Sequence, residues 1–171
     1  MAGLTLLELI IATSILVILA SAAMPLARVT VMRSRESELH YDLRQMRDAI
    51  DRYKDAADRG LIQVAQDSFG YPPDLETLVE GVTLSTSGDK KIRFLRKIPT
   101  DPMTGKAEWA LVEAPEGGFM GVHSLSEETP IKSGDFSAKD AAFADAENYT
   151  KWTFTYSPTG LGTSIVPGAK R

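Results

Sequence analysis

The sequence predicts an α+β protein in which a long N-terminal helix packs on a small antiparallel β-sheet head. Two observations predict the helix. Residues 9–27 carry no charge, and from residue 29 onward apolar side chains recur every three or four positions until Gly60. The third observation is a set of three short stretches rich in β-branched and aromatic residues, at 107–113, 119–124 and 151–156.

The first half of the helix is a candidate membrane segment. A hydrocarbon core ~30 Å thick needs ~20 apolar residues, a length that residues 9–27 reach together with residues 4–7. Glu8 stands at the front of this segment. A carboxylate in a membrane segment costs roughly 2.5–3.5 kcal/mol when it lies at the bilayer centre, and it usually marks function. A secretory signal peptide is the alternative. Its basic flank is missing, and residues 20–22 are the one candidate cleavage site.

The segment Gly3-Leu4-Thr5-Leu6-Leu7-Glu8, followed by an apolar helix with Pro25 near its far end, resembles the type IV pilins and pseudopilins. The resemblance implies that a prepilin peptidase removes residues 1–3 by cutting between Gly3 and Leu4, and methylates Leu4. It also implies that residues 4–27 first span the membrane and then form the core of a filament, with Glu8 and Pro25 acting in assembly. The leader is very short and lacks the usual basic residue.

Residues 28–59 are predicted to continue the helix as an amphipathic half. Pro25 removes an amide donor, so we expect a kink or local melting there. From Thr5 to Arg59 the helix would be roughly 80 Å long at 1.5 Å per residue. The apolar stripe is interrupted by Glu36 and consists of Val29, Met32, Leu39, Leu43, Met46, Ile50, Tyr53 and Ala57. A coiled coil over residues 29–57 is the alternative, which the shortness of the repeat disfavours.

The orientation in the membrane is predicted from the resemblance. Arg28, Arg33 and Arg35 follow the apolar segment, so a count of positive charges would leave the C-terminus in the cytoplasm. The resemblance implies the reverse, because the leader must face a peptidase on the cytoplasmic side. We follow the resemblance and expect a single-pass protein of the bacterial inner membrane with its head in the periplasm.

The head is predicted to cover residues 60–156 and to be followed by a flexible tail over residues 157–171. Asp74 can cap a short helix over residues 75–80, and residues 82–89 are expected to form a polar loop. The first two predicted strands form a hairpin across residues 116–118. The head resembles major pseudopilins of type II secretion systems in the order of Tyr71-Pro72, Phe94-Leu95, Ile98-Pro99, Asp101-Pro102, Gly105, Trp109, Tyr149 and Trp152.

The long loop over residues 125–150 is a candidate calcium site. Major pseudopilins of this type bind calcium between their last two strands, and Ca²⁺ takes about six to eight oxygen ligands. The predicted ligands here are Ser124, Ser126, Asp135, Asp140 and Asp145, with Glu147 and Asn148 nearby. The alternative is a solvated acidic loop that Phe136, Phe143 and Tyr149 hold in place by their burial.

Composition excludes several other functions. The net charge is −4, and residues 60–171 carry 11 basic and 15 acidic side chains, which argues against a nucleic-acid partner. There is no cysteine, so no disulfide closes the head. The two histidines, His40 and His123, do not suggest a catalytic site, since neighbours on a strand such as His123 and Ser124 point to opposite faces. We therefore do not expect an enzyme.

The function predicted from the resemblance is a structural subunit of a type II secretion pseudopilus. The implied partners are further copies of the chain, prepilin peptidase, the inner-membrane assembly platform, minor pseudopilins, and membrane lipid before assembly. One alternative is a type IV pilus subunit for adhesion or motility. A second is a single-pass anchored binding module that never polymerises, and Glu8 separates it from the others because an isolated anchor gains nothing from a buried acid.

Overall fold

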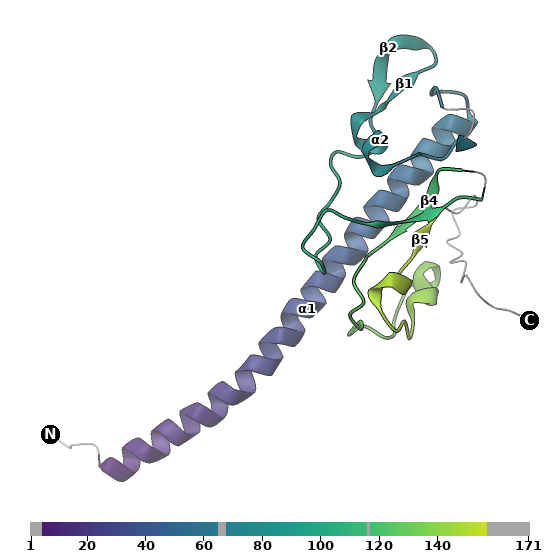
Figure 1. Ribbon diagram of the computed structural model, residues 1–171. Helices are drawn as coiled ribbons and strands as arrows, with labels where there is room; N and C mark the ends of the chain where they lie inside the picture. Colours follow the sequence, from purple (N-terminus) through teal and green to yellow (C-terminus); the bar gives the residue numbers. More distant parts are fainter. Residues whose placement is uncertain (1–4, 65–67, 116, 157–171) are drawn as a thin grey trace, which may run out of the picture.

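The computed structural model describes residues 5–64, 68–115 and 117–156, except for the side chains at 22–26, 138, 139 and 142. It shows an α+β fold in which a long N-terminal helix packs on small antiparallel sheets, as predicted (Figure 1). The elements in chain order are α1 (Leu6–Asp58), α2 (Leu75–Glu80), β1 (Val82–Leu84), β2 (Ser87–Ile92), β3 (Ala110–Glu113), β4 (Phe119–His123), η2 (Ala138–Phe143), η3 (Tyr149–Lys151) and β5 (Phe154–Thr155).

Helix α1 has 53 residues and is continuous through position 25. Its N-terminal half extends away from the head, and its C-terminal half forms the spine of the head (Figure 1). The helix ends at Asp58 with Arg59 as its C-cap, and Gly60 follows with a φ of 66°, a left-handed conformation that glycine adopts without strain. The predicted end of the helix is therefore confirmed. The helix is unbroken at position 25 in the single chain, and the predicted kink and the local melting on assembly stay predictions.

Within the described part of the chain, no helix meets the length and hydropathy required to span a membrane.

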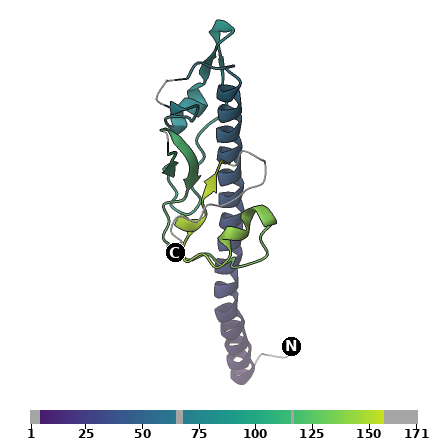
Figure 2. The same cartoon turned by 90° about the vertical axis from the view of Figure 1, so that its right-hand side faces the viewer.

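The core lies between the C-terminal half of α1 and the sheets. The apolar stripe of α1 is buried from Leu39 to Tyr53, as its spacing predicts. Val29, the first residue of the predicted stripe, is exposed because the head does not reach that far along the helix. Figure 1 and Figure 2 show the sheet of β4 and β5 beside the C-terminal half of α1, and the β1-β2 hairpin near the C-terminal end of the helix. Opposite the stripe, the head contributes Leu78, Phe94, Trp109, Phe119, Val122, Phe143, Tyr149, Trp152 and Phe154.

The larger sheet has three antiparallel strands in the order β3-β4-β5. Ala110 pairs with His123 across β3 and β4, and Val122 pairs with Phe154 across β4 and β5. The predicted hairpin of the first two strands is confirmed. The third strand was expected over residues 151–156, but Tyr149–Lys151 form a 3₁₀ turn instead and leave only two residues for β5.

A second hairpin, β1-β2, occupies much of the segment that was expected to be a polar loop. Val82 pairs with Ile92 and Thr83 with Lys91, and most of β2 is exposed. The expectation was wrong because β2 carries almost no apolar alternation. Backbone hydrogen bonds stabilise this hairpin, so its side chains need not alternate between apolar and polar residues.

Candidate functional site

The N-terminal half of α1 presents an apolar surface that no other described element covers. From Leu6 to Leu19, its large aliphatic side chains are all more than half exposed: Leu6, Leu7, Leu9, Ile10, Ile11, Ile15, Leu16, Val17, Ile18 and Leu19. A surface of this extent on a helix that is apolar on all sides is typical of contact with lipid or with other helices. The structure therefore separates the chain into a folded head and an unpartnered apolar rod.

Three hydroxyl side chains on this half are satisfied by the helix itself. The hydroxyls of Thr13, Ser14 and Ser21 donate to backbone carbonyls three or four residues earlier, over 2.7–3.0 Å. In an apolar environment an unpaired hydroxyl costs free energy, and these bonds remove that cost. These three hydroxyls can thus leave water without losing their hydrogen bonds.

Glu8 lies in the first turn of α1 and is exposed. Thr5 is the N-cap, and its hydroxyl accepts a hydrogen bond of 3.2 Å from the backbone N–H of Glu8. This Thr-x-x-Glu arrangement matches the capping-box spacing, and an acid in the first turn also complements the helix dipole. The predicted cleavage residues Gly3 and Leu4 lie outside the described residues, and nothing is described of the side chain of Pro25.

A buried carboxylate on α1 holds the long loop of the head. Glu36 is 5% exposed, and its Oε1 accepts hydrogen bonds from the backbone N–H groups of Ile131 (2.6 Å) and Lys132 (3.1 Å). The hydroxyl of Tyr149 donates to the same oxygen over 2.9 Å. Burial raises the pKa of Tyr149, and the hydrogen bond to Glu36 raises it further. The phenol therefore stays protonated and remains a donor.

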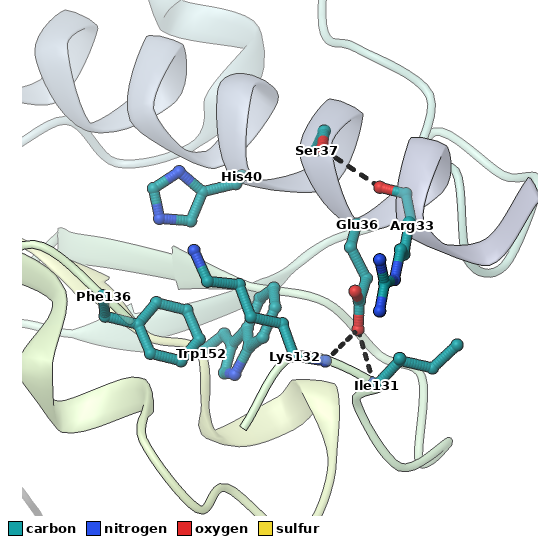
Figure 3. Close-up of a pocket in the computed structure, with 8 residues that line it drawn as sticks. All are labelled: Arg33, Glu36, Ser37, His40, Ile131, Lys132, Phe136 and Trp152. Atoms are coloured by element: carbon teal, nitrogen blue, oxygen red, sulfur yellow. Dashed lines mark hydrogen bonds between the residues drawn. The ribbon is translucent and has the colours of Figure 1, made fainter. Parts of the chain in front are cut away.

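A cavity of about 460 Å³ opens beside Glu36, between α1 and the loop (Figure 3). Arg33, Glu36 and His40 line it from one face of the helix, and Lys132 and Trp152 line it from the other side. Within the described residues, neither Arg33 nor Lys132 has a carboxylate within 4.0 Å, although the Lys132 ammonium lies 4.5 Å from the centre of the Phe136 ring. The cavity therefore offers charged and aromatic side chains for contact.

A second polar contact between the helix and the loop involves His40 and Asp140. Nε2 of His40 lies 3.3 Å from Oδ2 of Asp140, and the Arg44 guanidinium lies 3.6 Å from the same oxygen. The Ser137 hydroxyl also donates to it over 2.8 Å. Burial lowers the pKa of His40 although Asp140 acts in the opposite direction, and the positive charges of Arg44, Lys132 and Arg47 lower it further.

The predicted calcium ligand Ser124 is used inside the head instead. It is fully buried, and its hydroxyl donates to Oδ2 of Asp101 over 2.6 Å while accepting from the backbone N–H of Ser126 over 3.0 Å. Oδ1 of Asp101 accepts from the backbone N–H of Met103 over 2.8 Å. This network joins the end of β4 to the turn after Pro99. The ring of His123 contacts the Ser124 carbonyl rather than its hydroxyl.

The structure does not gather the five predicted calcium ligands. Ser124 and Ser126 lie in the Asp101 network, and Asp140 faces His40 on the helix. Asp135 and Asp145 are exposed. Across residues 5–64, 68–115 and 117–156, no three acidic or histidine side chains come close enough together to hold a metal ion.

Sequence reasoning missed the roles of Glu36 and Asp101. The signal for Glu36 was present, because this acid interrupts an otherwise apolar stripe and therefore faces the core. Its partners are 95 to 113 residues away, a distance over which spacing predicts no contact. Asp101 sits in a turn-rich segment where an aspartate is ordinary, so nothing in its neighbourhood signals complete burial.

Comparisons with protein-family models, with curated proteins and with solved structures found no match to this chain.

Proposed function

We propose that this chain is a structural subunit of a type II secretion pseudopilus. The observation that carries the proposal is one continuous helix with two environments, a bare apolar half and a half seated in the head. In the proposed assembly, the apolar halves of many copies bundle in the filament core and the heads face outward. Before assembly, the same half anchors the chain in the inner membrane, with the head in the periplasm.

The sequence around the helix start supports the same proposal. The Gly3–Glu8 segment resembles a prepilin processing site, and the helix begins at Leu6, directly after it. Cleavage after Gly3 would place the new ammonium group of Leu4 close to the start of the helix. In a filament, the Glu8 carboxylate of one copy would pair with the Leu4 ammonium of the next copy and neutralise both charges in an apolar core.

The N-cap geometry favours one competing function, a membrane-anchored module that does not polymerise. Glu8 in the first turn of a helix capped by Thr5 has a local role that needs no second copy, worth about 0.3–1 kcal/mol. A buried pair that loses one member costs more, roughly 3–5 kcal/mol. The two functions therefore predict different consequences for the loss of this charge.

Glu8→Gln separates them, because glutamine keeps the length and the capping-box spacing but not the charge. We expect the variant to insert and to be processed, but to assemble no filaments when expressed with the other components of the machine. Glu38→Gln, at an exposed acid on the head half of α1, is the matched control and should assemble normally. Normal filament yield from Glu8→Gln would reject the pairing and favour the unpolymerised anchor.

A further inference from the structure

We propose that the Glu36 carboxylate of α1 fastens the loop over residues 125–150 to the helix, and that this loop needs no bound cation to keep its place. The inference concerns the head alone, so it holds whether or not the chain polymerises. It contrasts with the calcium site that the family resemblance implies for the same loop.

The geometry around Glu36 supplies the fastening. A single carboxylate oxygen accepts from two consecutive backbone N–H groups, those of Ile131 and Lys132, and from the Tyr149 hydroxyl. These donors lie in the first third and at the end of the loop, so the carboxylate ties both parts to the helix. Hydrogen bonds to an ionised acceptor are the stronger kind, and three of them compensate the burial of the charge. The loop therefore binds the negatively charged carboxylate of Glu36.

The oxygen atoms that a cation would need are already engaged or dispersed. The hydroxyl of Ser124 lies between Asp101 and the N–H of Ser126. The Asp140 carboxylate is shared by Ser137, His40 and Arg44, and the last of these carries a positive charge that opposes a cation. The donor set therefore does not fit the calcium site that the sequence predicts.

Aromatic burial completes the attachment of the loop. Phe143 stacks against Trp152 with ring centres 5.8 Å apart, and Tyr149 meets Trp152 edge to face at 5.2 Å. Phe136 packs edge to face on both Phe143 and Trp152. These contacts give the loop an apolar core of its own against α1, which offsets the entropy of ordering it. The carboxylate then fixes its position relative to the helix.

The decisive test compares calcium with chelator on the full chain in detergent micelles. For the unmodified protein, we expect the same Tm in millimolar CaCl₂ and in excess chelator. A site saturated with calcium would instead raise the Tm by roughly 5 °C or more. A Tm that falls by that amount in chelator would overturn the proposal.

Substitution of Glu36 tests the fastening itself. Cleavage by trypsin after Lys132, detected by mass spectrometry, measures release of the loop from Glu36. The Lys132 side chain is exposed and accessible to trypsin, while its backbone N–H is bonded to Glu36. We expect Glu36→Gln to be cut there at least about tenfold faster, the ratio expected when hydrogen bonds to a charged group are lost. The matched control Glu38→Gln should be cut at the unmodified rate.

Tyr149→Phe provides a milder variant in case Glu36→Gln fails to fold. It removes one of the three donors and keeps the buried ring, so we expect a smaller acceleration, about threefold or more. Calcium should restore neither variant. Unchanged cleavage in both variants would overturn the role of Glu36, and rescue by calcium would return the loop to a metal-dependent account.

Discussion

Asp101 is the most deeply buried carboxylate of the described residues, with no exposed surface. An ionised group in that position costs several kcal/mol unless each oxygen finds donors. Oδ2 accepts from the Ser124 hydroxyl and Oδ1 from the Met103 N–H, which meets this requirement. Glu36 solves the same problem with three donors on one oxygen. At the scale of single residues, each of these buried acids binds at least one partner from a distant segment of the chain.

Ser124→Ala should destabilise the head through Asp101. The substitution removes the hydroxyl donor to Oδ2 and leaves a buried carboxylate oxygen short of a partner, at a cost of about 1–3 kcal/mol. Thermal unfolding followed by circular dichroism measures the effect. Ser37→Ala is the control, because Ser37 is exposed and its hydroxyl bonds only to its own helix at Arg33. Equal Tm values for the two variants would contradict a structural role for Ser124.

Asp51→Asn should stabilise the protein above pH 6. Burial raises the pKa of Asp51 from 3.8 to about 6, and its buried Oδ1 has no hydrogen-bond partner among the described residues. A raised folded-state pKa favours the protonated acid, so its contribution to stability is present below about pH 4 and is lost as the pH rises through 6. We expect the variant to gain about 1 kcal/mol at pH 7.5 and nothing near pH 4.

Denaturant titrations at the two pH values check this prediction. Asp89→Asn on the exposed strand β2 is the control and should show no such difference. A gain for Asp51→Asn that is equal at both pH values would contradict the titration of this carboxyl.

At the scale of elements, local signals account for the parts that were predicted. Gly60 follows the last helical turn, and the 3.6-residue period places Leu39 to Tyr53 in the core. The parts that were not predicted depend on long-range contacts. The β1-β2 hairpin has no apolar alternation, and the loop over residues 125–150 takes its place from Glu36, about a hundred residues earlier. Composition does not show which acids of this loop already have partners, as Asp140 has in His40.

Gly121 allows β4 and β5 of the larger sheet to approach each other closely, because it has no side chain. A Cβ at this position in β4 would lie 2.4 Å from the Phe154 carbonyl oxygen in β5. Gly121→Ala should therefore push β5 away and destabilise the head by about 1–3 kcal/mol, as overpacking does. Gly88→Ala in β2 meets no atom within 4 Å and serves as the control in the same thermal unfolding experiment. Equal stability of the two variants would contradict this packing of β4 on β5.

At the scale of the whole molecule, one helix joins two surfaces with opposite requirements. The head half of α1 finds its contacts within the chain. Its apolar stripe packs against the head, and its buried acid, Glu36, accepts hydrogen bonds. In the other half, the apolar side chains from Leu6 to Leu19 are exposed among the described residues. A long exposed apolar rod is a stable solution only in lipid or against other helices. The proposed pseudopilus supplies both in sequence, lipid before assembly and neighbouring helices afterwards.

The state of the mature N-terminus tests this account most directly. Intact-mass and peptide mass spectrometry on protein made in cells that carry a prepilin peptidase would read it. The account predicts that the mature chain begins at Leu4 with a methylated amino group, so that the ammonium needed to pair with Glu8 lies at the start of the rod. A mature chain that keeps Gly3 and the residues before it would contradict the account and leave the unpolymerised anchor.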